Sequence, residues 1–153
     1  MSGYALFEHE KLIDHGTIKL GKKDDIYENI LFSAQCAIVK LIDTTQANIV
    51  VIEDIQLQNR NVSTYKKLAL LMGALLSKFQ ELDKPFTIVP PTRWRSFCQI
   101  KGRKRSEQKE NTLTFAKEQF GLCDISEDTA DAVAMGWWAV NNSEIMCTGK
   151  EGN

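Results

Sequence analysis

Length, composition and charge set the first limits on this protein. The chain has 153 residues, 43% of them hydrophobic and 25% charged, with a formal net charge of −1 at pH 7. This size suits one compact domain with its own core. No apolar run approaches the roughly 20 residues that a membrane helix needs, and no basic segment followed by an apolar run opens the chain. We therefore expect a cytoplasmic protein that has no membrane partner.

The cysteines and histidines indicate neither a zinc site nor a redox site. The cysteines are widely spaced and form no C-x-x-C pattern, so we expect reduced thiols. They are Cys36, Cys98, Cys123 and Cys147. The two histidines, His9 and His15, form no metal-binding cluster and no obvious catalytic triad.

The small net charge conceals an asymmetry along the chain. From Arg93 to Lys117 there are eight basic residues against two acidic ones, a net charge of +6, whereas the remainder has 11 basic and 18 acidic residues, a net charge of −7. Four of the basic residues fall within residues 101–105. A concentrated basic segment on an otherwise acidic chain indicates a polyanionic partner. The alternative is a solvated loop with scattered lysines.

The N-terminal half alternates predicted strands and helices. Residues 3–8 and about 12–20 are predicted strands of a hairpin. Helical periodicity over 24–42 predicts an amphipathic helix, and the apolar run 48–53 predicts a buried strand. A long helix is predicted from Ser63, its expected cap, to about Leu82. Its broad apolar stripe suits either the core or a dimer face.

The C-terminal half begins with a short predicted strand, Phe86–Val89, and continues with helices. These are Arg93 to about Ile100 with Thr92 as its cap, Ser106–Phe120 ended by Gly121, and a last helix that Ser126 caps and that runs to about Val140. This order predicts an α/β domain over residues 1–141, with helices on both faces of a mixed sheet. Residues 142–153 form a polar tail.

Three carboxylates lie where a metal-dependent nuclease would need them. Glu53 ends the apolar strand, where a charge is unfavourable unless it serves a function. Asp128 and Asp131 are three residues apart at the start of the last predicted helix, so they share one face. Oxygen ligands of this kind suit a hard cation such as Mg²⁺. The alternatives are that Glu53 has simply emerged into solvent and that the helix dipole stabilises acids in a first turn.

The layout resembles the RuvC-type Holliday junction resolvases of the RNase H-like nuclease superfamily, over essentially the whole chain. Ser2-Gly3-Tyr4 resembles the end of that family's first motif, where a small hydroxyl residue, Gly and Tyr open the second strand. Ile52-Glu53-Asp54 is similar to the acid on the fourth strand. Asp128 to Ala134, DTADAVA, resembles the D-x-x-D-A-x-A helix that supplies the last two acids.

This resemblance implies an RNase H-like mixed sheet flanked by helices, and a nuclease site. In that family four acids hold two Mg²⁺ ions, for which Mn²⁺ is a possible substitute. By resemblance Glu53, Asp128 and Asp131 are catalytic metal ligands that also place the attacking water. Arg95 and Lys109 match basic positions that face DNA near the metals. The expected DNA-binding residues are Arg93, Arg95, Lys101, Arg103, Lys104, Arg105 and Lys109.

The chain departs from the family pattern at two places. The family's first acid is an aspartate on the central first strand, ahead of the residues that match Ser2-Gly3-Tyr4, and no such residue precedes them here. We expect a missing or shortened first strand and impaired cleavage by the chain as written, because Asp14, Asp24 and Asp25 are no obvious substitutes. Bacterial members carry an aromatic residue after the fourth strand that can wedge against junction bases. Gln56 lies near this position here, and because a glutamine stacks poorly, we expect broader selectivity for branched DNA.

Aromatic residues lie among the basic ones. Trp94 and Phe97 can stack on bases or anchor a short helix to the core, and we favour the anchor. Trp137 and Trp138 follow an alanine-rich helix face and are expected in the core or an interface. The polar loop Asn59-Arg60-Asn61 contacts either the DNA backbone or solvent.

These features predict a structure-selective endonuclease that resolves Holliday junctions and other branched DNA, similar to phage-encoded relatives in the host cytoplasm. Symmetric cutting of a four-way junction needs two sites related by a two-fold axis, so we expect a homodimer with the helix Ser63–Leu82 as its candidate interface. Two alternatives stay open: a junction-binding protein without catalysis, and another RNase H-like nuclease, for example one acting on RNA. An unrelated α/β binding module explains neither the acids nor the basic segment.

Overall fold

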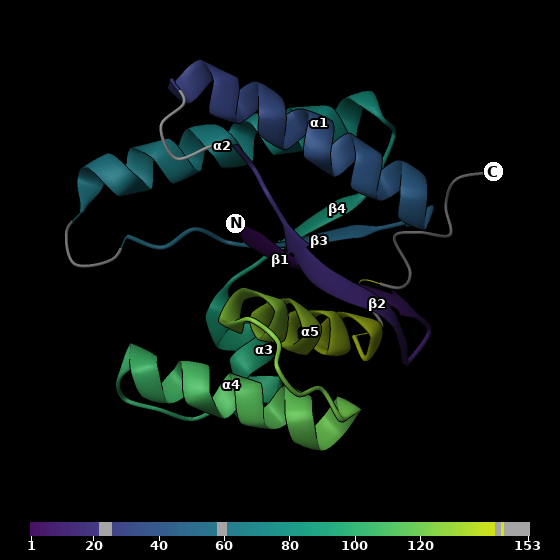
Figure 1. Ribbon diagram of the computed structural model, residues 1–153, viewed down its shortest axis with the longest axis vertical. Coiled ribbons are helices and arrows are strands. Elements are labelled where there is room, and N and C mark those ends of the chain that lie inside the picture. The colour runs from purple at the N-terminus through teal and green to yellow at the C-terminus, as the bar shows by residue number, and fades with distance from the viewer. Residues whose placement is uncertain (22–25, 58–60, 143–144, 146–153) are drawn as a thin grey trace. The chain divides into compact units, whose positions relative to one another are not determined.

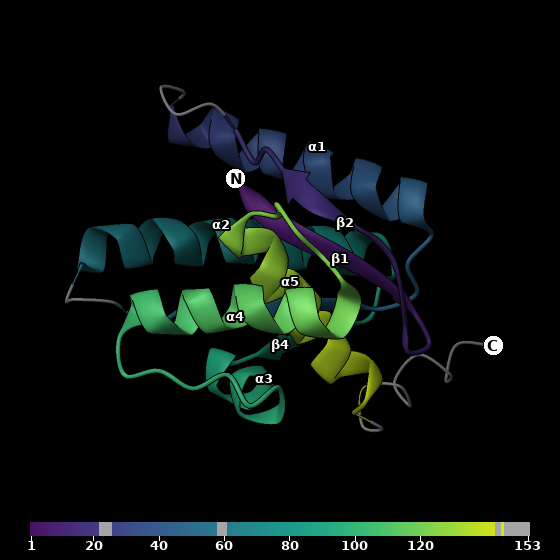
Figure 2. The ribbon, with the colours of Figure 1, turned by 60° about the horizontal axis from the view of Figure 1, so that its bottom comes forward.

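The computed structural model describes residues 1–21, 26–57, 61–142 and 145. They fall into two compact units, of which unit 1 is Met1–Ile18 with Val89–Asn153 and unit 2 is Lys19–Ile88. Figures 1 and 2 show the elements of both units. Several predictions lie outside the described residues: those for Asp24 and Asp25, for Asn59 and Arg60, for Cys147, and for most of the polar tail.

Unit 1 opens with the predicted hairpin. Strand β1 (Ser2–Glu8) pairs antiparallel with β2 (Lys11–Ile18), from Ser2 opposite Ile18 to Glu8 opposite Lys11. The register shifts between Leu6 and Phe7. His9 has a φ of 54°, in the left-handed region that a tight turn between two strands uses.

Three helices complete unit 1: α3 (Pro91–Phe97), α4 (Arg105–Phe120) and α5 (Glu127–Val140). Helix α5 is the centre of this unit, because it contacts both strands of the hairpin and also α3 and α4 (Figure 1). Small side chains permit this close packing, since Ala130, Ala132 and Ala134 are all buried. At Gly136 a Cβ atom would lie 2.5 Å from the ring of Phe7.

Unit 2 places two long helices against a small sheet. Helices α1 (Tyr27–Thr45) and α2 (Val62–Glu81) pack on each other, and β3 (Val50–Glu53) pairs with β4 (Phe86–Val89). The core of this unit consists of Ala34, Ile42, Leu75 and Phe79. Val50, Ile52 and Phe86 from the two strands pack against it, which fixes β3 and therefore Glu53 at its end.

The fold confirms the predicted mixed α/β class and the order of its elements. Two predicted helix caps are wrong. Asn61, not Ser63, caps α2, because its side-chain oxygen accepts the Thr64 N–H at 3.1 Å. Helix α3 starts at Pro91 after Pro90, without a side-chain cap from Thr92, because the ring of Pro91 already fixes a helical φ at the first position. The predicted caps Ser126 and Gly121 are confirmed.

No helix among the described residues is long and apolar enough to cross a membrane.

Candidate metal and nucleic-acid site

The start of α5 is fixed to the hairpin by a chain of hydroxyl groups. Ser126 Oγ accepts the backbone N–H of Thr129 at 3.1 Å and lies 2.9 Å from the Thr129 hydroxyl. The hydroxyl of Thr129, which is buried, donates to the carbonyl oxygen of Gly16 at 3.0 Å. Since that hydroxyl hydrogen is engaged by Gly16, Ser126 must be the donor to Thr129. The first turn of α5 is therefore held rigidly against β2.

A second constraint on the same turn comes from Gly3 in β1. A Cβ atom at Gly3 would lie 1.9 Å from the carbonyl oxygen of Asp128 and 2.6 Å from the backbone nitrogen of Thr129. Such distances are impossible for a real side chain, so only glycine lets β1 pass this close to α5. Packing therefore requires a glycine at position 3. Gly3 sets how closely Asp128 approaches the hairpin.

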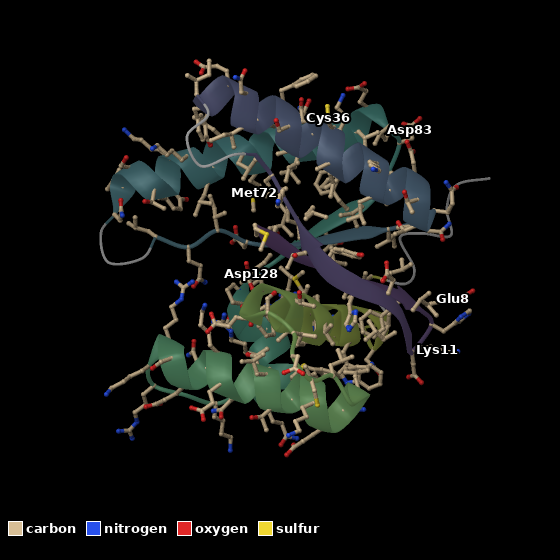
Figure 3. All side chains as sticks on the ribbon, in the orientation of Figure 1. Glu8, Lys11, Cys36, Met72, Asp83 and Asp128 are labelled. Carbon is tan, nitrogen blue, oxygen red and sulfur yellow. The ribbon has the colours of Figure 1, made fainter. Side chains whose placement is uncertain are left out.

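The structure brings Asp128 and Asp131 together on α5, as predicted, but in different environments. Asp128 is exposed at the start of the helix (Figure 3), whereas Asp131 is half-buried one turn further on. Burial raises the pKa of Asp131 above its usual value, and the nearby charge of Asp128 raises it further. Arg95, a hydrogen bond with the Thr112 side chain, and Lys109 each lower this pKa, but they do not offset the loss of hydration.

The hydroxyl of Thr112 has two possible acceptors. It donates to the carbonyl oxygen of Gln108 at 2.8 Å and also lies within hydrogen-bonding reach of Asp131. The single hydroxyl hydrogen is therefore shared between these two acceptors. Its contact with Asp131 lowers the pKa of that carboxyl, but by less than burial raises it.

Arg95 approaches Asp131 from α3 and is held by two contacts. Its guanidinium carbon lies 4.8 Å from the ring centroid of Trp94, and its Nη1 donates to Oε1 of Gln108 at 3.2 Å. Trp94 is fully buried, so the surface under the guanidinium is rigid. Among the described residues the buried Nε of Arg95 finds no hydrogen-bond acceptor. Trp94 is thus the anchor that we favoured, whereas Phe97 on the same helix is 46% exposed.

Lys109 reaches Glu127 and Asp131 from α4. Its ammonium group forms an ion pair with Glu127, the residue before Asp128, and its charge also lowers the pKa of Asp131. Lys109 is half-buried, while Glu127 is exposed. Two cationic side chains from two different helices therefore lie close to Asp131.

The basic segment also includes the loop before α4 and Arg93 of α3. Gly102 has a φ of 154°, and Glu107 Oε2 accepts the backbone N–H of Arg103 at 2.9 Å. The loop is therefore ordered by its own helix. The exposed basic side chains here are Arg93, Lys101, Arg103, Lys104 and Arg105, whereas Arg95 and Lys109 are half-buried.

Glu53 belongs to unit 2. It is the last residue of β3 and is half-buried. The alternative, that Glu53 has simply emerged into solvent, is therefore only partly supported. Gln56, three residues later, is exposed in a segment without regular structure.

The donor set on α5 fits a hard cation in part. Asp128 and Asp131 offer carboxylate oxygens from adjacent turns, which is the chemistry that Mg²⁺ selects. Within the described ranges, however, no group of three or more His, Cys, Asp or Glu side chains is placed so that it could hold a metal ion. The two aspartates would need further ligands, from water or from substrate phosphates, as is usual for this ion.

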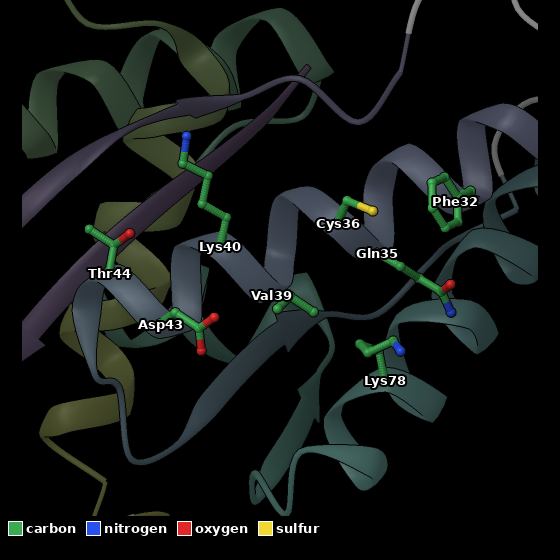
Figure 4. Close-up of a pocket in the computed structure, with 8 residues that line it drawn as sticks. All are labelled: Phe32, Gln35, Cys36, Val39, Lys40, Asp43, Thr44 and Lys78. Atoms are coloured by element: carbon green, nitrogen blue, oxygen red, sulfur yellow. The ribbon is translucent and has the colours of Figure 1, made fainter.

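A surface hollow of about 480 Å³ lies elsewhere, on α1 (Figure 4). Apart from Lys78 of α2, all the residues that line it come from α1, among them Phe32, Cys36 and Asp43. It contains none of the predicted site residues and no set of groups that suggests chemistry.

Gln108 and Thr112 were not predicted from the sequence. Both are polar residues inside a predominantly polar helix, and no local pattern separates them from ordinary helix residues. Their contacts to Arg95 and Asp131 depend on how α3, α4 and α5 pack together, which spacing along the chain does not reveal.

The fold and this site together define a mixed α/β protein with an acidic pair on α5 and two cationic side chains beside it. Nothing matches among protein-family models or curated proteins. Among solved structures, Thermus thermophilus RuvC in complex with a Holliday junction substrate matches with a TM-score of 0.69 and 14% sequence identity, over 88% of this chain and 81% of that one. A structure of Thermus thermophilus RuvC matches with a TM-score of 0.69 and 16% identity, over 89% of this chain and 80% of that one. The likeness establishes a RuvC-type fold.

Proposed function

We propose that this protein is a Mg²⁺-dependent, structure-selective endodeoxyribonuclease that resolves four-way junctions and other branched DNA. The observation that carries the proposal is the pair Asp128 and Asp131 on α5 with two cationic side chains, Arg95 and Lys109, close to Asp131. Carboxylates beside cations suit phosphodiester hydrolysis, where a metal needs oxygen ligands and a phosphate needs positive charge. The RuvC-type fold supports the same conclusion, since one similar structure is a complex with a Holliday junction.

The residues of the chain have separate roles in this proposal. Asp128 and Asp131 bind the metal, for which Mn²⁺ can substitute, and Glu53 joins them on the strength of the sequence resemblance alone. A metal ion held by these residues would supply Lewis-acid chemistry, which lowers the pKa of a water molecule and offsets negative charge on a leaving oxygen. Arg95 and Lys109 lie next to the carboxylates and lower the cost of bringing a phosphate to them. The exposed basic residues contact the DNA backbone: Arg93, Lys101, Arg103, Lys104 and Arg105.

The proposed enzyme is a homodimer. A four-way junction is two-fold symmetric, and two symmetric cuts need two sites related in the same way. The exposed apolar residues of the N-terminal half of α2 support this helix as the contact, among them Val62, Leu68 and Leu70. Sedimentation equilibrium tests this, and a strictly monomeric protein at micromolar concentration would contradict it.

The test of function is a cleavage assay on an immobile four-way junction with Mg²⁺ or Mn²⁺. It compares the chain with Asp131→Asn, Asp128→Asn and Glu53→Gln, and with Glu118→Gln as a control at an exposed position of α4. Because the resemblance expects a further aspartate on a preceding strand, a form extended by such a strand is assayed in parallel. We expect the acid substitutions to lower cleavage by at least 100-fold, since removal of a group that stabilises transition-state charge costs this much.

Two outcomes of this assay would redirect the proposal. If no form cuts but all bind the junction with equal affinity, the protein is a branched-DNA-binding protein without catalysis. If a linear RNA–DNA hybrid or an RNA is cut in preference to the junction, the protein is another RNase H-like nuclease.

A further inference from the structure

Gln108 occupies a position in unit 1 that joins the basic loop to Arg95. Its side chain, half-buried on the first turns of α4, makes two hydrogen bonds in opposite directions. Oε1 accepts from Nη1 of Arg95 at 3.2 Å, and Nε2 donates to the carbonyl oxygen of Gly102 at 3.0 Å. The backbone carbonyl oxygen of Gln108 also accepts a hydrogen bond from the hydroxyl of Thr112, at 2.8 Å.

Chemistry leaves one orientation for this carboxamide. A guanidinium can only donate, so an oxygen must face Arg95, and a carbonyl can only accept, so an N–H must face Gly102. Glutamine is the neutral residue of this length that meets both demands. A glutamate would keep the partner of Arg95 but set a carboxylate against a carbonyl oxygen, and a methionine would lose both bonds.

The loop packs tightly against α4 where Gln108 contacts Gly102. At Gly102 a Cβ atom would lie 2.9 Å from the backbone nitrogen of Gln108, and the φ of 154° is one that side chains rarely adopt. One residue earlier, the side chain of Asn111 donates to the carbonyl oxygen of Lys101 at 2.6 Å. Two amide side chains of α4 therefore hold two successive carbonyl groups of the loop, and only that of Gln108 also reaches Arg95.

We propose that Gln108 is a positioning residue that couples the basic loop to Arg95: its carboxamide holds the loop in the shape that binds phosphate and holds the guanidinium over Trp94, beside the acidic face of α5. The loop that binds DNA at residues 101–105 and the placement of Arg95 next to the carboxylates are then linked through the side chain of Gln108. This inference rests on the proposed nuclease function for its kinetic consequence, but not for the contacts themselves.

The test separates the two ends of the link with matched substitutions. Gln108→Glu and Asn111→Leu each release the loop while Arg95 keeps its partner, and Gln108→Met releases both. Gln119→Glu is the charge control, because Gln119 is exposed near the other end of α4. Thermal unfolding of all four variants verifies that they are folded.

Two measurements test these contacts without requiring the protein to cleave DNA. Hydrogen exchange of the backbone amides of residues 101–104 should be about five-fold faster in the first three variants, the effect of losing one neutral hydrogen bond. Exchange of the buried Arg95 Nε–H, followed by NMR, should be faster in Gln108→Met and unchanged in Gln108→Glu and Asn111→Leu. Unchanged loop exchange in Gln108→Met would overturn the inference, as would equal Arg95 exchange in Gln108→Met and Asn111→Leu.

Junction cleavage then tests the consequence. We expect KM to rise about five-fold in all three loop-releasing variants, and kcat to fall only in Gln108→Met. A merely structural role predicts the same loss of kcat in Gln108→Met and Asn111→Leu, and that result would overturn the coupling. If the unsubstituted chain neither binds nor cuts branched DNA, the proposed function is wrong, and the two exchange measurements still decide whether Gln108 holds the loop and Arg95.

Discussion

At the scale of single residues, Trp94 and Phe97 show how two aromatic residues on one short helix take opposite roles. Trp94 is fully buried and lies under the Arg95 guanidinium, whereas Phe97 is 46% exposed. We expect Trp94→Ala to lower the free energy of unfolding by about 3–5 kcal/mol and Phe97→Ala by less than about 1 kcal/mol. Urea denaturation of both variants measures this, and equal losses would show that Trp94 is not the anchor.

Asp131 makes stability depend on pH. Burial raises its pKa in the folded protein, so between the usual pKa of 3.8 and the raised pKa the folded chain binds more protons than the unfolded chain. Stability must therefore fall as pH rises through this window, and the full cost is present above the raised pKa. Asparagine resembles the protonated acid and avoids this cost.

We accordingly expect Asp131→Asn, in metal-free buffer, to be more stable than the unsubstituted protein at pH 7, with a difference that shrinks as pH falls and vanishes below 3.8. Thermal unfolding across pH 3–8 measures the difference, with Glu118→Gln as the exposed control. A gain that does not change with pH would mean that ionisation of Asp131 is not its cause. A buried carboxylate that lowers the stability of the folded protein when it is ionised and has no cation bound is suited to be a cation ligand.

At the scale of elements, the position of Asp128 depends on the contact between β1 and the first turn of α5. Because a Cβ atom at Gly3 would lie 1.9 Å from the carbonyl oxygen of Asp128, Gly3→Ala must push the strand and the helix apart. We expect a loss of roughly 2 kcal/mol or more. At Gly73 in α2 nothing lies within 4 Å, so Gly73→Ala should instead gain about 0.5–1 kcal/mol. Chemical denaturation distinguishes them, and a tolerated Gly3→Ala would contradict this close approach.

The elements also show what the sequence can predict and what it cannot. Helix starts and ends that depend on local chemistry were predictable at Ser126 and at Gly121, whose φ of 69° suits glycine. The start of α2 was misplaced because Asn61 and Ser63 both suit a cap, and the sequence does not show which of them accepts a backbone N–H of the first turn. The acid pair was predictable because a spacing of three places two residues on one helix face. The environment of Asp131, set by Arg95 and Thr112 from other helices, was not, since it depends on tertiary packing.

At the scale of the whole molecule, the net charge of −1 says little about binding, because residues 93–117 carry +6 and the remainder −7. A chain with no excess of positive charge binds DNA only if its positive charge is gathered on one surface. Within this segment Lys101, Arg103, Lys104 and Arg105 are all exposed. The location of the charge, rather than its amount, should therefore control affinity for DNA.

Salt dependence tests this directly. Each phosphate neutralised contributes about 0.9 to the slope of log K against log of salt concentration, so replacing these four residues by Gln should lower the slope by up to about 3.6. The control replaces four exposed lysines outside the segment, which changes the net charge equally: Lys11, Lys19, Lys40 and Lys66. Fluorescence anisotropy with a labelled four-way junction, without divalent metal, gives both slopes. If both quadruple variants lower the slope equally, binding follows net charge and the basic loop is not the DNA-binding surface. If only the first does, the loop that Gln108 holds is the surface that meets the phosphates.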